Sequence, residues 1–131
     1  MSDHKLVLHY KDGTLHAVRS QLFEDGTATI PAVTQDGEKL AVPVERLKAA
    51  FFVKSYLGNP DYQRVKDEEA LRAETSGRFV RIRFKDGETL LGEVSSKADL
   101  GRPFFLKLLD PNDNNLMVYV NPKYLDGPPE A

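Results

Sequence analysis

The chain of 131 residues contains no cysteine and no tryptophan, and it has no long apolar run. Without cysteine there is no disulfide, no thiolate nucleophile and no Cys-ligated metal site, so a reducing compartment such as the cytoplasm is expected. No stretch approaches the roughly 18 apolar residues of a membrane-spanning helix, and residues 1–10 lack the apolar region of a signal peptide. We therefore expect a cytoplasmic protein without a membrane partner.

A large excess of charge of one sign is also missing. The formal net charge is -2, which gives the whole molecule no electrostatic attraction to nucleic acid or to an anionic membrane. Hydrophobic residues make up 40% and charged residues 29% of the chain, values that predict a packed core. The length suits one ordinary domain or two very small barrels that share a core.

The common catalytic motifs are absent as well. The sequence has no Gly-x-Ser-x-Gly elbow, no P-loop, no dinucleotide-binding glycine pattern and no His-Glu-x-x-His. Carboxylates occur as sequence neighbours, such as Glu24 and Asp25, and nothing in the pattern indicates the burial that would shift their pKa. We expect a protein that is not an enzyme and needs no cofactor.

What the chain has is Asp-Gly, five times, between alternating apolar and polar runs. Asp-Gly favours a two-residue type I′ turn, so hairpins are predicted at Asp12-Gly13 and Asp86-Gly87. That register pairs Lys85 with Glu88 and His9 with His16. It also gives each hairpin one apolar face, made of Leu6, Leu8, Tyr10, Leu15 and Ala17 in the first and of Val80, Ile82, Phe84, Thr89 and Leu91 in the second.

The order of strands and turns predicts a mostly β protein in two halves. Further strands are expected at residues 27–33, 39–44, 49–56, 104–109 and 116–120. Pro43 lacks a donor, which predicts that its strand lies at an edge of the sheet or stops pairing there. The expected organisation is a first small barrel at 1–58, a connector at 59–77 that could form a short helix, a second small barrel at 78–126 and a frayed tail at 127–131.

The two halves have similar sequences in the same order. LVLHYKDGTL is echoed by VRIRFKDGET, and KLAVPVERL by NLMVYVNPKYL, which predicts two pseudo-repeated small β-barrels packed together. The Phe51-Phe52 and Phe104-Phe105 pairs do not fall at equivalent places in this match. Either the duplication is imperfect or the two barrels exchange strands.

The succession of strands and turns in each half resembles the SH3-like and Sm-like small barrels. Gly92, five residues after a turn, fits the sharp bend of a strand in such barrels, whereas the first half has Val18 there. The chain also resembles an uncharacterised bacterial domain family with LKAxFFV at residues 47–53 and FxDGExLxG at 84–92, followed by FFL at 104–106 and DPxxNN at 110–115. This resemblance implies a bacterial origin and no catalytic residues.

Three groups of residues are candidates for binding. Basic residues line the outward face of one strand and could bind an anionic ligand, either a nucleotide-type molecule or RNA: Arg78, Arg81, Arg83 and Lys85. An outward basic face is also common on strands that resist edge pairing. His9 and His16 are weak candidates for a metal site, since two imidazoles do not complete the four ligands of structural zinc.

The phenylalanine pairs form the third group. Neighbouring residues of a strand point to opposite sides, so one member of each pair can enter a core while the other needs a second apolar cover. The other half of the protein is the expected cover for Phe51, Phe52, Phe104 and Phe105. Otherwise these side chains would form a surface for a protein partner or a second copy. The expected function is therefore non-catalytic binding or self-association, with binding of an anion to the basic strand as the alternative.

Overall fold

The computed structural model describes residues 3–57, 69, 77–109 and 113–130. Its strands are β1 (His4–Tyr10), β2 (Leu15–Ser20), β3 (Thr29–Thr34), β4 (Lys39–Pro43), β5 (Leu47–Val53), β6 (Arg78–Arg83), β7 (Thr89–Val94), β8 (Phe104–Leu108) and β9 (Asn115–Val120). Two short 3₁₀ turns, η1 (Val44–Arg46) and η2 (Pro122–Tyr124), follow β4 and β9. The connector expected at 59–77 lies outside the described residues, apart from Glu69 and Gly77.

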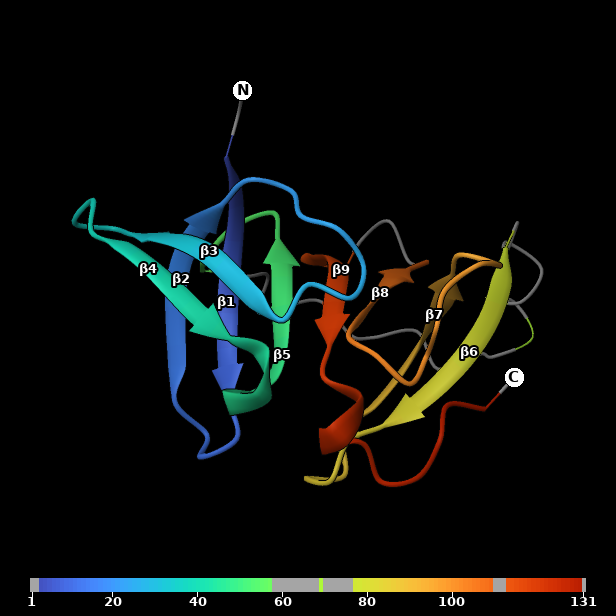
Figure 1. Cartoon of the computed structure of the whole chain (residues 1–131). Coiled ribbons are helices and arrows are strands. Elements are labelled where there is room, and N and C mark those ends of the chain that lie inside the picture. Colours follow the sequence, from blue (N-terminus) through green and yellow to red (C-terminus); the bar gives the residue numbers. More distant parts are fainter. Residues whose placement is uncertain (1–2, 58–68, 70–76, 110–112, 131) are drawn as a thin grey trace.

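The strands form one antiparallel sheet in the order β4-β3-β2-β1-β5-β9-β8-β7-β6. The mostly β fold is thus confirmed, but the sheet is continuous and does not close into a barrel. Figure 1 shows β1 to β5 on one side of the molecule, β6 to β9 on the other, and β5 beside β9 where the halves meet. The predicted edge position of the Pro43 strand is confirmed, because β4 ends the sheet. Within the described residues, no helix has the length and apolar character to cross a membrane.

β5 and residues 118–120 of β9 are buried on both faces, and each face supplies a different core. Phe51 and Val118 contribute to the core of the second half, which we call the second core, whereas Phe52 and Tyr119 contribute to the first core. The second core also holds Val80, Ile82, Phe84, Leu90, Phe104 and Leu106, and the first core holds Leu6, Leu8, Val18, Ile30, Val42 and Leu47. Each half therefore completes the core of the other, as expected for the phenylalanine pairs.

The predicted register of both hairpins is wrong by one residue. Arg83 pairs with Thr89, and the Phe84 N–H donates to the Glu88 carbonyl, so the loop has three residues, Lys85 to Gly87. Only Gly87 takes a positive φ, +95°, and Asp86 does not. A three-residue loop of this kind combines a type I turn with a bulge at glycine, whereas a type I′ turn needs positive φ at both central residues. The first hairpin has the same geometry, with His9 opposite Leu15.

The shift changes which residues of the returning strands face the cores. Leu90 is buried in place of the predicted Thr89 and Leu91, and Val18 is buried in place of Leu15, which is 61% exposed. The outgoing strands keep their predicted faces, because Leu6, Leu8, Val80, Ile82 and Phe84 are all buried.

Residues 126–130, which include the described part of the tail expected to fray at 127–131, lie along β6. The Arg81 N–H donates to the Glu130 carbonyl and the Glu130 N–H to the Arg81 carbonyl, at 2.6 and 2.8 Å. The Asp126 N–H donates to the Arg83 carbonyl at 2.8 Å. Residues 126–130 therefore cover the edge of the sheet at β6, near the end marked C in Figure 1.

Gly92 lies where two strands approach closely. A Cβ at this position would stand 2.4 Å from the Lys107 carbonyl oxygen and 2.9 Å from Leu106 Cγ, and a backbone oxygen moves only if the strand moves. We expect Gly92→Ala to lower the free energy of unfolding by about 2–3 kcal/mol, as for other overpacked sites. Urea unfolding followed by circular dichroism measures the change.

Gly101→Ala is the matched control. Its nearest neighbour is the Asp99 carboxylate at 3.3 Å, in an exposed loop where the side chain can turn away. This substitution should change the stability by less than about 0.5 kcal/mol. Equal losses for the two variants would contradict the close approach at Gly92.

Candidate functional site

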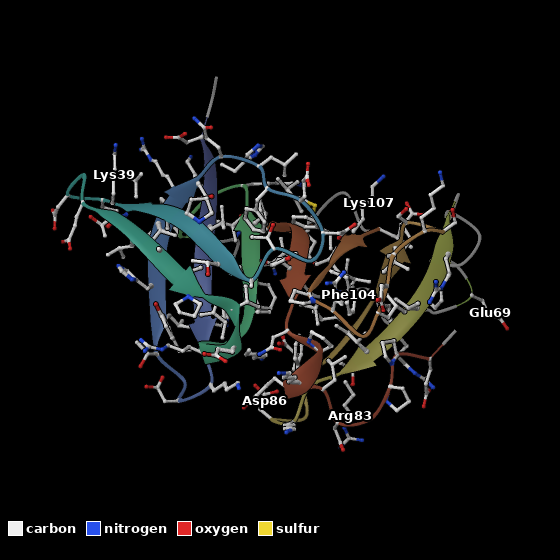
Figure 2. The ribbon with its side chains drawn as sticks, in the orientation of Figure 1. Lys39, Glu69, Arg83, Asp86, Phe104 and Lys107 are labelled. Atoms are coloured by element: carbon white, nitrogen blue, oxygen red, sulfur yellow. The ribbon has the colours of Figure 1, made fainter. Side chains whose placement is uncertain are left out.

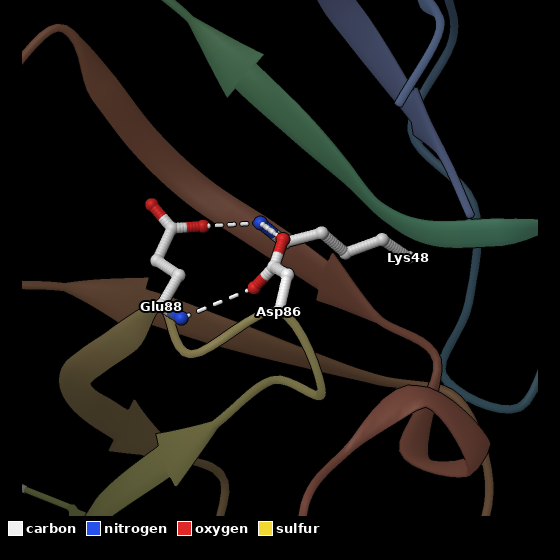
Figure 3. A network of polar contacts seen from close by, with 3 residues as sticks. All are labelled: Lys48, Asp86 and Glu88. Carbon is white, nitrogen blue, oxygen red and sulfur yellow. Dashed lines mark hydrogen bonds and ion pairs between the residues drawn. The ribbon is translucent and has the colours of Figure 1, made fainter. Parts of the chain in front are cut away.

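Lys48 is the one cation within the otherwise apolar β5, and it is only 8% exposed. Its Nζ donates to Asp86 Oδ2 at 2.7 Å and to Glu88 Oε1 at 2.6 Å (Figure 3). It also lies 4.7 Å from the centre of the Phe84 ring, within the range of a cation–π interaction. Both carboxylates belong to the β6–β7 turn, so this cluster of charges joins the two halves of the protein.

The charges in this cluster stabilise one another. Burial alone would lower the pKa of Lys48, but the hydrogen bonds and charges of Asp86 and Glu88 outweigh it, and the pKa is raised. Burial likewise opposes ionisation of Asp86, yet the hydrogen bonds from Lys48 and from the Glu88 N–H leave its pKa below the usual range. The amine is therefore protonated at neutral pH, with no free electron pair for use as a nucleophile or base.

His9 packs at the edge of this cluster. Its ring centre lies 4.2 Å from that of Phe51. Burial, and then the positive charge of Lys48, lower the pKa of His9, while the two carboxylates oppose this effect more weakly. The imidazole is consequently neutral at pH 7 and acts as a packing group between the sheet and the ion pairs.

The structure does not bring the two predicted metal-binding histidines together. His9 pairs with Leu15 and His16 pairs with Leu8, and paired residues share a face of the sheet. Because His9 follows Leu8 in the strand, the two imidazoles lie on opposite faces. The described residues contain no group of three or more potential metal-ligating side chains.

Of the four basic residues predicted on one strand face, Arg81 and Arg83 share a face of β6, and carboxylates adjoin both. Arg78, Arg81, Arg83 and Lys85 are all exposed, but Arg78 has the phase of the buried Val80 and Ile82, and Lys85 lies in the turn after β6. The Arg81 guanidinium forms an ion pair with Glu130, and Arg83 Nε lies 3.8 Å from Asp126 Oδ2. Both carboxylates come from the segment along β6, and they border a groove of about 370 Å³ that the two arginines also line. In Figure 2, Arg83 lies at the bottom of the view, on the same side as Asp86 and away from Lys39 of β4 at the upper left.

The phenylalanine pairs offer little surface to a partner. Phe51, Phe52 and Phe104 are buried inside the single chain, and Figure 2 shows Phe104 enclosed by the strands of the second half. Phe105 is partly buried against Phe52 and the ring of Tyr119. The suggestion that Phe51, Phe52 and Phe104 form a surface for a partner is therefore wrong. An apolar side chain that already packs in a core gains nothing from contact with a partner.

Tyr119 and the 24–27 loop connect the halves on the other face. The Tyr119 hydroxyl donates to the Thr27 carbonyl at 2.8 Å, and burial, with the nearby charge of Asp25, raises its pKa to about 12. The Gly26 N–H donates to the Pro103 carbonyl, and the Phe105 N–H to an Asp25 carboxylate oxygen. The loop is thereby fastened to the start of β8.

A groove that sequence patterns do not reveal runs across this junction. One part, of about 510 Å³, is lined from the first half by Ala28, Thr29 and residues 43–45, and from the second half by Gly101, Pro103 and residues 121–123. An adjoining part of about 560 Å³ shares Gly101, Pro122 and Lys123 and adds Leu100, Leu125 and residues 127–129. The prolines are scattered over the sequence, so only the fold brings them together.

The Lys48 cluster left one signal in the sequence. A single cation within LKAAFFV, a run otherwise without charge, implies a buried lysine that needs carboxylate partners. The partners lie 38 and 40 residues away, in a turn that looks like any other solvated Asp-Gly corner.

Comparison with known proteins identifies a family, but the function of that family is unknown. Residues 2–127 match the model of a family of unknown function, DUF6982. No curated protein and no solved structure matches the chain.

We expect Lys48→Met to lower the free energy of unfolding by about 1–3 kcal/mol at pH 7, because it leaves two carboxylates without their cation. The loss stays below that of a fully buried pair, since the Asp86 side chain is 41% exposed and solvent screens it. A carboxyl with a lowered pKa contributes stability above its unfolded pKa and loses it as the pH falls through the folded pKa. The difference between wild type and variant should therefore shrink in acid.

Urea unfolding between pH 7 and pH 2.5 measures this difference. Lys107→Met is the control, because Lys107 Nζ lies 3.6 Å from Glu93 and its side chain is 68% exposed. It should cost less than about 0.5 kcal/mol at every pH. A loss at Lys48 that does not vary with pH would contradict the role of Asp86.

His9 provides a second measurement on the same cluster. Its pKa, followed by NMR through the imidazole Cε1 proton, should lie below 6.5 in the wild type and rise in Lys48→Met, because the carboxylates then act without the opposing cation. Since folding favours the neutral ring, stability is complete above pH 6.5 and declines as the pH falls from 6.5 through the folded pKa. An unchanged His9 pKa in the variant would show that burial alone accounts for the shift.

Proposed function

The chain belongs to the family of unknown function DUF6982, which supplies no activity, and from its own geometry we propose a non-catalytic binding module for a protein partner. The groove across the junction of the halves is the binding surface, and its occupant is an extended peptide segment. The observation that carries this proposal is that the part of the groove of about 510 Å³ is lined by residues of both halves.

The groove lining favours apolar contact. Its walls include Pro43, Pro103, Pro122, Pro128 and Pro129, which have no N–H to satisfy. Within the described residues, its charged lining is limited to Glu45 and Lys123. A peptide with small apolar or proline residues and one charge of each sign matches this lining.

The polar groups of the floor already have partners within the chain. Asn121 is buried, and its Nδ2 donates to the carbonyls of Val44 and Leu47, while its Oδ1 accepts from the Lys123 N–H. The floor is therefore rigid and needs no new hydrogen bond from a ligand, which supports recognition by shape.

The charged groups support binding over catalysis. The lysine with the strongest local interactions, Lys48, has a raised pKa and two carboxylate partners. Asp86 has a lowered pKa, the opposite of a general acid tuned to work near neutral pH.

We also propose that the two halves are diverged copies of one small SH3-like or Sm-like unit. Equivalent backbone bonds close each half: Lys11 N to Arg46 O and Gly13 N to Tyr10 O in the first, and Lys85 N to Tyr124 O and Gly87 N to Phe84 O in the second. In the first half β5 then pairs with β1, and in the second half residues 125–130 bridge to β6 at two points. On this proposal, the junction groove forms where the two units meet through the pairing of β5 with β9.

The absence of cysteine in the whole sequence supports the cytoplasm as the place where this module works. The resemblance of residues 47–53 and 84–92 to uncharacterised bacterial domains supports a bacterial origin. Self-association through the groove is the second form of the proposal, and light scattering at rising protein concentration separates it from binding of another protein.

Two exposed alanines provide a matched test of the groove. Ala28 lines it and Ala41 lies outside it on β4. A peptide selected on the wild type from a phage-displayed library of random 12-residue sequences should bind Ala28→Trp at least about tenfold more weakly, because the indole fills the groove. The same peptide should bind Ala41→Trp as it binds the wild type, in fluorescence anisotropy.

Circular dichroism checks that both variants are folded. No enriched peptide, or equal affinity of the wild type and Ala28→Trp, would overturn the groove as the binding surface.

A further inference from the structure

The segment 126–130 occupies β6 as a bound peptide would. Backbone hydrogen bonds join it to Arg81 and Arg83, two with Glu130 and one with Asp126. Its two acidic side chains reach the same two arginines. Main-chain pairing with side-chain charges at alternate positions of the edge strand is the usual geometry of strand addition to a sheet.

This arrangement is built for one kind of ligand. Arg81 and Arg83 are two residues apart on β6, so their side chains leave the same face of the strand. The carboxylates that meet them are four residues apart, because Gly127, Pro128 and Pro129 arch away from the strand between the two points of contact. The groove of about 370 Å³ lies between the arch and the arginines.

The segment 126–130 pairs with β6 less extensively than β5 pairs with β1 in the first half. There, β5 pairs with β1 along most of its length and every residue of β5 is buried. Here the ion pairs are solvent-exposed, with side chains 46% and 63% exposed for Arg81 and Glu130, and surface pairs contribute little to stability. Two prolines without donors further reduce the pairing.

We propose that the β6 edge with Arg81 and Arg83 is a second binding surface, which takes an extended acidic segment of a partner protein. The segment 126–130 is its internal occupant and leaves when the partner binds. The partner carries two carboxylates that reach the two guanidinium groups while its backbone pairs with β6. Residues 127–129 of this segment also line the second part of the junction groove, so the two surfaces share that wall, whereas the part of the groove at Ala28 lies apart from it.

Phosphate-bearing ligands are the competing class, since arginine also binds phosphate. The observed occupant favours the peptide, because backbone pairing with β6 requires a donor and an acceptor in the main chain. RNA supplies phosphates without such a backbone, and its binding would also draw on exposed Arg78 and Lys85.

The full chain carrying Asp126→Lys and Glu130→Lys tests the proposal, because lysines at these positions repel the arginines and open the surface. The probe is a fluorescein-labelled peptide with the sequence of residues 125–131, LDGPPEA. It should bind the double variant at least about tenfold more tightly than the wild type, and the affinity should fall as salt rises. NMR shifts of the Arg81 and Arg83 amides locate the bound peptide.

Asp36→Lys with Glu38→Lys is the matched control, since it changes the net charge equally at the exposed β3–β4 turn. This control should bind the peptide no better than the wild type. Adding Arg81→Glu and Arg83→Glu to the opened variant should abolish binding, as should replacing both acidic residues of the peptide by amides.

Three results would overturn the proposal: no binding to the opened variant, binding that survives the arginine substitutions, or binding of a ten-nucleotide oligouridine in place of the peptide. Ala28→Trp separates the two surfaces, because it blocks the junction groove and should leave binding of LDGPPEA to the opened variant unchanged.

Discussion

Burial of both faces of the β5–β9 pair is the constraint on which the remaining structure depends. Alternate residues of a strand point to opposite sides, so a strand that lies between two cores is buried on both faces. β5 has seven buried residues in succession, and all are apolar except Lys48, which has the carboxylates of Asp86 and Glu88 as partners. Neither half can leave without exposing Phe51 or Phe52 to water, and this makes two small units one cooperative structure.

The local part of this architecture could be predicted from the sequence. The Asp-Gly corners, the outgoing strands of both hairpins and the edge strand ending at Pro43 follow from turn chemistry and alternation. The register could not, because Asp-Gly fits both a two-residue type I′ loop and a three-residue loop in which only the glycine needs positive φ. That one-residue difference moved Leu90 into the core and separated His9 from His16.

The charged contacts were harder to predict because they join distant parts of the chain. Lys48 stands out in β5, but nothing local marks Asp86 and Glu88 as its partners. The basic face of β6 was visible in the alternation of Arg81 and Arg83, whereas the carboxylates opposite them lie in or beside the tail that was expected to fray. Backbone hydrogen bonds of Asp126 and Glu130 hold this segment along β6, and nothing in the local sequence indicates them.

Buried ion pairs and apolar surface contribute differently to the contact between the halves and to the proposed binding. Ion pairs such as Lys48 with Asp86 are directional, and their burial beside Phe84 gives them a cost if the halves meet in another register, so they favour one arrangement. The apolar lining of the junction groove has no such directional demand, which suits the shape recognition proposed for it. The exposed ion pairs of Arg81 and Arg83 lie between these limits, because they are specific in charge but contribute little to stability.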